Sequence, residues 1–344
     1  MSQAQAASIL TPAAEARIKR HIALTAEHYG GVPGEMYTAT PALAQTLNDK
    51  IILDGNWFLQ LINVMPVTQM TGEKIILGLS GLVTSRTDTS GSGERSPKNL
   101  VALSNQPYTL YKTESDVALK YSTIDSWAKF PDFAARYGMA VSKAIGNDRV
   151  RIGWNGTSAA SASNISTSPN LEDVNKGWLQ LLREYNSGSQ VVTATGGSPV
   201  QLGGTTFPNL DALVYNAITM LSIEFRDDPD LIVLLGRNVV QYAKGKYYSI
   251  NGNTPMQKGW MLQEGRIIDT YGGLVAMVPP FFPTNAIMVT CLKNLSIYWQ
   301  DTSWRRMQQN YPRKDQFEDF NSRNEGYVVE HEGNAALIEN ITYA

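Results

Sequence analysis

The sequence predicts an α+β fold, because helical and strand-like segments alternate along its 344 residues. In the longest helical segment apolar residues recur every four positions, as at Tyr137, Val141 and Ile145, which is typical of an amphipathic helix. The continuous apolar run at 231–235 is instead typical of a strand that is buried on both faces. The length predicts about two domains, and no internal repeat indicates a solenoid.

The chain carries few charges. Lys and Arg number 29 and Asp and Glu number 31, so the formal net charge is −2. Charged residues make up 17% of the sequence, against a usual value of about 25%. Without a general basic field, DNA binding through phosphate contacts is excluded as the main activity. Low charge is typical of extensive protein–protein contact surfaces, but a β-rich globular protein with uncharged loops is equally consistent with this composition.

Cys291 is the only cysteine, so no disulfide can form within the chain and no cysteine-based metal site is possible. Its mostly apolar neighbours predict a buried structural thiol. The N-terminal residues lack the basic start and apolar run of a signal peptide. No stretch approaches the roughly 20 apolar residues that cross a bilayer. We therefore expect a soluble protein that is made in a reducing cytoplasm and contacts no membrane.

The N-terminal part predicts an extended arm. An amphipathic helix is expected at 11–29, with Thr11 as its cap and Pro12 at its first position. Glycine, proline and small polar residues at 30–40 indicate a linker. A second helix begins after Thr40.

A long two-stranded excursion follows the arm. Strand patterns occur at 61–85 and again at 108–121, and apolar periodicity disappears from 84 to 105 between them. An isolated hairpin is marginally stable in water, so we expect support from outside this chain's own core. The polar segment carries five charged residues that we predict to contact other subunits: Arg86, Asp88, Glu94, Arg95 and Lys98. The alternative is a solvated tip.

The remaining chain predicts further alternation of helices and strands. In order, we expect a long helix at 123–155 opened by Pro131, a loop at 156–170, a helix capped by Asn170, a loop at 187–208, a helix capped by Asn209, a strand at 231–235, a helix at 239–247, a loop at 249–264, strands at 274–278, 286–292 and 295–299, and alternating segments at 327–332 and 336–341.

A search for catalytic or ligand-binding motifs gives a negative result. No G-x-x-x-x-G-K-[ST] loop occurs, and the segment 91–96 fails the dinucleotide fingerprint. The three histidines, His21, His28 and His331, lack the spacing of a zinc site. We therefore predict no catalytic residue, no cofactor, no metal ligand and no enzymatic activity.

Two acidic groups need an explanation. Asp227, Asp228 and Asp230 lack the loop glycine and final glutamate of an EF-hand, so they are expected to form a turn before the strand that follows. Glu330 and Glu332 are expected on a strand edge that faces solvent or another subunit.

Seven ordered segments carry a recognisable pattern: 68–75 (TQMTGEKI), 81–89 (GLVTSRTDT), 93–98 (GERSPK), 177–180 (GWLQ), 228–237 (DPDLIVLLGR), 294–306 (NLSIYWQDTSWRR) and 327–330 (YVVE). None is a catalytic signature, but together they are specific. In this pattern the chain resembles the major capsid protein of P-two-like tailed bacteriophages, with matches that span roughly residues 38–342.

The resemblance implies the Hong Kong ninety-seven capsid fold, which has an N-terminal arm, an extended loop, a peripheral domain with a long spine helix, and an axial domain. Transferred to this chain, it implies an arm at 1–67, the extended loop at 68–120, the peripheral domain at 121–204, the axial domain at 205–290, and a return to the peripheral domain at 291–344. The predicted hairpin becomes the extended loop, which lies on a neighbouring subunit.

The implied function is that of a structural virion protein. Copies would form hexamers and pentamers of an icosahedral shell around double-stranded DNA, without sequence-specific contact to that DNA. The implied partners are a scaffolding/protease protein and a portal, with assembly in the host cytoplasm. A bacterial nanocompartment shell of the same fold, which encloses protein cargo, is the alternative, and an α+β enzyme is the third class.

The resemblance also implies maturation at the N-terminus. Capsid proteins of this kind lose an N-terminal segment to a phage protease, and the matching bond here is Tyr37–Thr38, which would remove residues 1–37. The glycine-rich boundary at 30–34 favours access by a protease. The alternative is a permanent arm that packs on a neighbour through Ile18 and Ile22.

Overall fold

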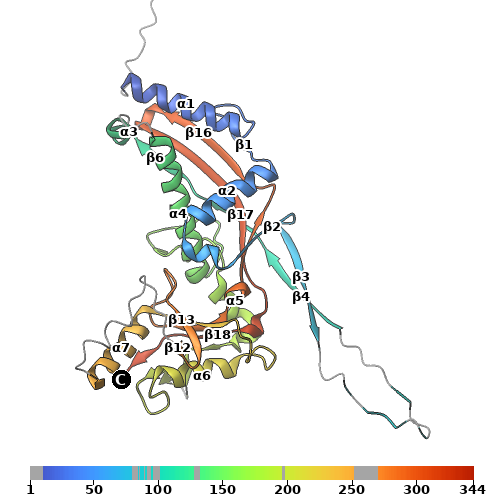
Figure 1. Ribbon diagram of the computed structural model, residues 1–344. Helices are drawn as coiled ribbons and strands as arrows, with labels where there is room; N and C mark the ends of the chain where they lie inside the picture. Colours follow the sequence, from blue (N-terminus) through green and yellow to red (C-terminus); the bar gives the residue numbers. More distant parts are fainter. Residues whose placement is uncertain are drawn as a thin grey trace, which may run out of the picture.

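The computed structural model describes residues 11–79, 101–127, 132–195, 198–251 and 270–344, together with Thr84, residues 86–88, Ser90, Glu94 and Arg95. Helices and strands alternate along these residues, which confirms the α+β class. The larger sheets occupy two ends of an elongated body, and a hairpin projects sideways from the region between them (Figure 1).

One sheet, which has seven strands in the described residues, is built along the long strand β17 (Gln316–Val329). The neighbours of β17 pair with it antiparallel, each over part of its length: β16 (Arg305–Tyr311), β15 (Leu295–Gln300), β5 (Tyr111–Glu114) and β6 (Val117–Lys120). The edges are formed by β1 (Tyr37–Thr38), which pairs with β16, and β2 (Asn63–Val67), which pairs with β15.

A second sheet has six strands within the described ranges, in the order β12 (Thr270–Tyr271), β13 (Leu274–Met277), β11 (Leu231–Leu235), β14 (Ile287–Cys291), β18 (Ala335–Ile338) and β7 (Val191–Val192). Side chains alternate between two apolar cores. Val233 and Leu235 face one core, and Leu234 faces the other. Burial on both faces explains the continuous apolar run in the sequence.

Three helices pack against the seven-stranded sheet: α1 (Pro12–His28), α2 (Pro41–Asp54) and α4 (Phe133–Asn155). The end of α2 lies directly on α4, where a Cβ added to Gly146 would come within 2.7 Å of the Cα of Gly55. A glycine at 146 therefore permits close helix packing in the middle of an otherwise continuous helix. On the other sheet, α6 (Leu210–Met220) covers the core that contains Val233.

Besides the projecting hairpin, the other described elements are the helices α3 (Tyr121–Trp127), α5 (Trp178–Glu184) and α7 (Arg237–Asn251), the short strands β8 (Ala194–Thr195), β9 (Ser198–Pro199), β10 (Gln201–Leu202) and β19 (Thr342–Tyr343), and the 3₁₀ turns η1 (Trp57–Gln60), η2 (Tyr185–Gly188), η4 (Leu292–Asn294), η5 (Pro312–Lys314) and η6 (Glu332–Asn334). In this part of the chain, no helix combines the length and the apolar character that a membrane span needs.

The predicted helix starts are confirmed at Thr11, Thr40 and Asn209 and wrong at Asn170. Thr11 accepts a hydrogen bond from the backbone N–H of Ala14, and Asn209 accepts one from that of Ala212 at 2.9 Å. The helix expected after Asn170 does not form. Glu172 instead accepts hydrogen bonds from the backbone and side chain of Asn170, at 2.9 and 3.1 Å, and α5 begins only at Trp178. A local side-chain turn thus competes successfully with the helix.

The end of the chain also differs from the expectation. β18 pairs with β14 in the six-stranded sheet, and β19 pairs with β10. The residues from 335 onward therefore lie with the sheet that contains β11 and β14, although 291–344 was expected to return to the other domain. The long helix is confirmed, but α4 begins at Phe133, and the Pro131 expected to open it lies outside the described residues.

The projecting hairpin and its root

The strands β3 (Thr71–Leu79) and β4 (Val101–Thr109) form a two-stranded antiparallel hairpin that leaves the body (Figure 1). Their register runs from Thr71 opposite Thr109 to Leu79 opposite Val101. At the base, the backbone N–H of Leu110 donates to the carbonyl of Met70 at 2.8 Å. Within the described ranges the two strands pair only with each other, as the sequence predicted for an excursion without its own core.

An apolar root holds the base of the hairpin. Leu110 is fully buried with Tyr298 and Val328, and the ring of Tyr108 meets that of Tyr298 edge-on at 5.2 Å. Gly326 on β17 permits this contact, because a Cβ at that position would come within 2.8 Å of the Leu110 side chain. The hairpin therefore begins in close contact with β17.

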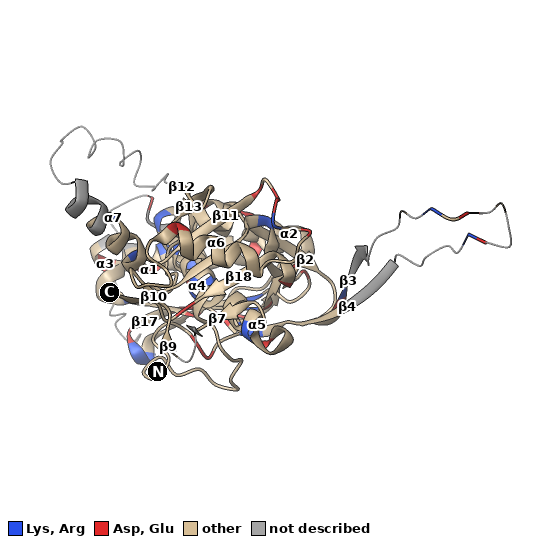
Figure 2. Ribbon diagram, turned by 90° about the horizontal axis from the view of Figure 1, so that it is seen from below, with Lys and Arg blue, Asp and Glu red and all other residues tan. Residues whose placement is uncertain are grey.

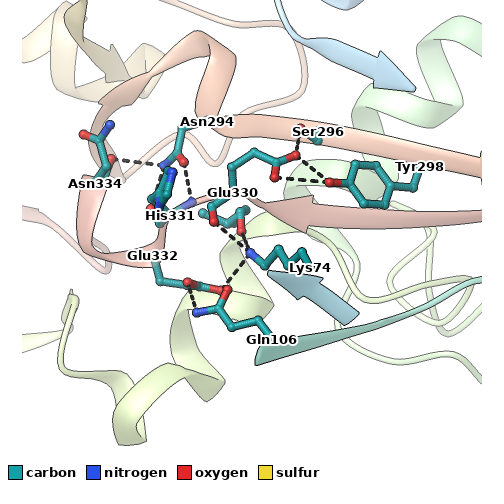
Figure 3. A network of polar contacts seen from close by, with 10 residues as sticks. Lys74, Gln106, Asn294, Ser296, Tyr298, Glu330, His331, Glu332 and Asn334 are labelled. Carbon is teal, nitrogen blue, oxygen red and sulfur yellow. Dashed lines mark hydrogen bonds and ion pairs between the residues drawn. The ribbon is translucent and has the colours of Figure 1, made fainter. Parts of the chain in front are cut away.

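A polar clamp holds the hairpin further out. Lys74 and Gln106 lie directly opposite each other on β3 and β4. Both donate to the carboxylate of Glu332, with Lys74 Nζ 3.3 Å from Glu332 Oε1 (Figure 3). Lys74 also donates to the backbone carbonyls of Val329 and Glu330, the latter at 3.0 Å. Burial lowers the pKa of Lys74, an effect that the nearby Glu332 carboxylate opposes.

The turn that presents Glu332 is itself fixed. Asn294 is buried, and its side-chain amide donates to the carbonyl of His331 at 2.9 Å and accepts from the His331 N–H at 2.7 Å (Figure 3). The carboxylate of Glu330 does not take part in this clamp and accepts hydrogen bonds from the hydroxyls of Ser296 and Tyr298. The prediction of a solvated or subunit-facing edge for Glu330 and Glu332 is therefore wrong, because both carboxylates bind groups of their own chain.

The charged residues predicted to contact other subunits are exposed where the structure describes them. Arg86, Asp88, Glu94 and Arg95 all face solvent, and Lys98 lies outside the described residues. Asp88 accepts hydrogen bonds from the hydroxyl and the backbone N–H of Ser90, and these bonds lower the pKa of its carboxyl.

The Tyr37–Thr38 bond lies in the edge strand β1. Tyr37 stacks on Tyr29 with a ring separation of 5.4 Å, and burial raises its pKa to about 12. The helix α1 that precedes this strand buries Ala14 and Ile18 against α3, α4 and β17. In this structure α1 is thus packed on its own chain.

A buried ionic cluster, which the sequence analysis did not identify, lies where α2 and α4 meet β17. Arg149 donates to Glu325 at 2.8 Å and to Asn48 at 2.7 Å, and Arg323 donates to the same carboxylate. Burial raises the pKa of Glu325, but the two guanidinium groups outweigh this effect and lower it to about 2. The side chains of Arg149, Arg323 and Glu325 are only 1–2% exposed. Such a cluster has a structural role, because it is sealed from solvent.

Cys291 is buried, and burial raises the pKa of its thiol to about 11, so the prediction of a structural thiol is confirmed. Among the residues that the structure describes, no three His, Cys, Asp or Glu side chains gather as a metal site would require.

Comparison with known proteins identifies the family. Residues 17–341 match the family described as phage major capsid protein, P2 family. This chain belongs to that family. The P2-family chain is 36% identical over 322 residues to the capsid protein of Escherichia phage P2. The aligned region covers 90% of this chain and 88% of that protein. This chain is 29% identical over 316 residues to the major capsid protein of Serratia phage KSP20, with 90% of each chain covered.

Solved structures agree with the family assignment. A chain in the satellite phage P4 procapsid, solved with its size determination protein, matches with a TM-score of 0.70 and 33% identity, over 87% of the P2-family chain and 99% of its own length. A capsid chain of cyanophage A-1(L) shares the fold, with a TM-score of 0.53 and 14% identity, over 84% of this chain and 93% of its own.

These matches confirm the Hong Kong ninety-seven capsid fold and the resemblance found in the sequence. The P2-family chain is a structural capsid protein that assembles with copies of itself as part of the virion, and it is not an enzyme. Its family favours the phage head over the nanocompartment alternative.

Proposed function

We propose that copies of this chain form the hexamers and pentamers of a closed icosahedral shell that encloses double-stranded DNA. The observation that carries the proposal is the β3–β4 hairpin, which leaves the body and pairs with no other strand in the described residues (Figure 1). An isolated hairpin gains little stability in water. Contact with a neighbouring subunit would supply the missing support, and a closed array adds many weak contacts into a stable whole.

The charge distribution supports a wall that confines DNA without specific contacts. The net charge is −2, and basic and acidic residues are interspersed over the elements seen in Figure 2. DNA held by phosphate contacts would need a concentrated basic surface.

Electron microscopy of the purified chain tests the closed shell, and nuclease protection tests the enclosed DNA. Particles that hold only protein would contradict the DNA part of the proposal.

We propose that the exposed charged residues between β3 and β4 contact polar groups of neighbouring subunits. Arg86, Asp88, Glu94 and Arg95 are exposed, as expected for groups that bind outside their own chain, and we include Lys98 in this contact. Each exposed ion pair is worth about 0–1 kcal/mol, but the contact repeats in every subunit. We expect Arg95→Glu to lower the yield of particles, whereas the charge-matched Arg313→Glu on η5 serves as the control.

We further propose that a scaffolding/protease protein and a portal take part in assembly in the host cytoplasm, and that the protease removes residues 1–37. The bond Tyr37–Thr38 lies in β1, an edge strand, so cleavage there would leave the interior strands of the sheet paired. Intact mass of the protein from mature virions tests this. A chain that still begins at residue 1 or 2 would instead support a permanent arm.

A further inference from the structure

We propose that Lys74, Gln106 and Glu332 are positioning residues that set the direction in which the β3–β4 hairpin leaves the body. The inference rests on the proposed function, since this direction matters for assembly only if the hairpin reaches a neighbouring subunit. The three side chains form one contact between the hairpin and the turn that follows β17 (Figure 3).

The hairpin contacts the body at two positions along its length. Two such contacts fix the direction in which the hairpin projects. The first is the apolar root, where Leu110 packs against Tyr298, Val328 and the surface left free by Gly326. The second lies four residues further out, at Gln106, a distance of about 13 Å along a strand. A hairpin fixed only at its root could pivot there, whereas the second contact prevents that motion.

The second contact engages both strands at once. Lys74 and Gln106 are direct cross-strand partners, and each donates to a different oxygen of the Glu332 carboxylate. A contact from one strand alone would permit rotation about that strand. The three donors of the Lys74 ammonium are satisfied by Glu332 and by the carbonyls of Val329 and Glu330.

The clamp is shielded from solvent and has a rigid base. The side chains of Lys74 and Glu332 are only 11% and 14% exposed, so their ion pair is less screened than a surface pair. Asn294 fixes both the N–H and the carbonyl of His331, next to Glu332. This turn is also the connection from β17 to β18, so the hairpin is oriented by the same residues through which the chain passes from one sheet to the other.

The test measures the direction within one chain. Spin labels at Glu94→Cys, in the segment that joins β3 to β4, and at Arg313→Cys, on η5, report by double electron–electron resonance the distance between that segment and the body. Both positions are exposed, whereas the native Cys291 is buried. Labelled full-length chain is diluted with an excess of unlabelled chain, so that distances between copies do not contribute.

Two substitutions remove the clamp in different ways. Lys74→Met keeps the length of the side chain and removes its donors, and Gln106→Ala removes only the partner on β4. We expect both to broaden or shift the distance distribution of the parental chain, and Lys74→Arg to restore that distribution. The matched control is Lys112→Met, because Lys112 is exposed and pairs only with its near neighbour Glu114 among the ion pairs of the described residues.

A purely structural role would lower the melting temperature without moving the distance peak. The proposal is therefore overturned if Gln106→Ala, folded by circular dichroism, keeps the parental distribution, and this variant decides alone if Lys74→Met does not fold. Particle yield is measured separately, because it tests the proposed contact with a neighbouring subunit and not the direction of the hairpin. Arg95→Glu leaves the distance peak unchanged and tests only the contact with a neighbour, so either idea can fail without the other.

Discussion

The two sheets of this capsid protein bury different kinds of side chain. The six-stranded sheet packs mostly aliphatic residues on both faces, as along β11 and β14. The seven-stranded sheet buries the cluster of Arg149, Arg323 and Glu325 beside its apolar core. Apolar burial depends little on pH, whereas a buried ion pair depends on the charge of each partner. The two ends of one subunit should therefore differ in their response to acid and to single substitutions.

The largest effect is expected from Glu325→Ala. The change leaves two buried guanidinium groups without their carboxylate, so we expect the free energy of unfolding to fall by about 3–5 kcal/mol. Chemical denaturation of the chain measures it. Glu318→Ala on the same strand is the control, because Glu318 is bound by the neutral side chains of Gln309 and Gln316 and has no ion-pair partner among the described residues. Equal effects of the two substitutions would remove the distinction between the sheets.

A slightly smaller effect is expected from Leu235→Ala in the six-stranded sheet. Leu235 is fully buried on β11, so its truncation creates a cavity and costs about 2–5 kcal/mol. This loss should be the same at pH 7 and pH 4, because no charge of the cluster is involved. Denaturation at both pH values measures the loss, and a strong pH dependence would show that the two sheets do not differ in their response to acid.

The acid response of the seven-stranded sheet comes next. The pKa of Glu325 is lowered from 4.5 to about 2 by the guanidinium groups, against the effect of burial. A carboxyl with a depressed folded-state pKa stabilises the protein above its unfolded-state pKa and loses that contribution as pH falls. We therefore expect about 3 kcal/mol of stability to disappear between pH 4.5 and 2. Hydrogen exchange of β17 should increase before that of β11, and the reverse order would refute this prediction.

A weaker pH effect is expected at α1. Burial lowers the pKa of His21, Arg306 lowers it further, and Asp319 opposes both. The neutral ring packs against Tyr137 and Phe317. Because the folded-state pKa lies below the ordinary 6.5, α1 should become less tightly packed as pH falls below that value. Hydrogen exchange of α1 measures the effect, and His21→Gln should abolish its pH dependence.

The smallest effect on the subunit itself is expected from Arg95→Glu. Arg95 is exposed and lies between β3 and β4 along the chain, outside both sheets, so the melting temperature of the unassembled chain should stay unchanged. A lower melting temperature would show that the hairpin contributes to the stability of the chain's own fold. Particle yield is then measured with the same protein.

The sequence by itself determined the α+β class, the capsid family, the helix starts at Thr11 and Asn209, the buried strand β11 and the hairpin that projects from the body. These features have local causes, since capping residues, apolar runs and the loss of periodicity are all visible within short segments. The predictions of intersubunit contact at Arg86 and its neighbours and of cleavage at Tyr37–Thr38 concern other molecules, so they stay predictions.

Only the tertiary structure decided the place of the charged residues on β17 and the turn that follows it. Arg323, Glu325 and Glu332 resemble surface residues in the sequence, yet each binds a partner that lies elsewhere along the chain: Ser115 and Trp304 for Arg323, Arg149 for Glu325, and Lys74 for Glu332. The physical reason is that a buried charge is stabilised by a specific partner at hydrogen-bond distance, and such pairing leaves no periodic pattern in the sequence.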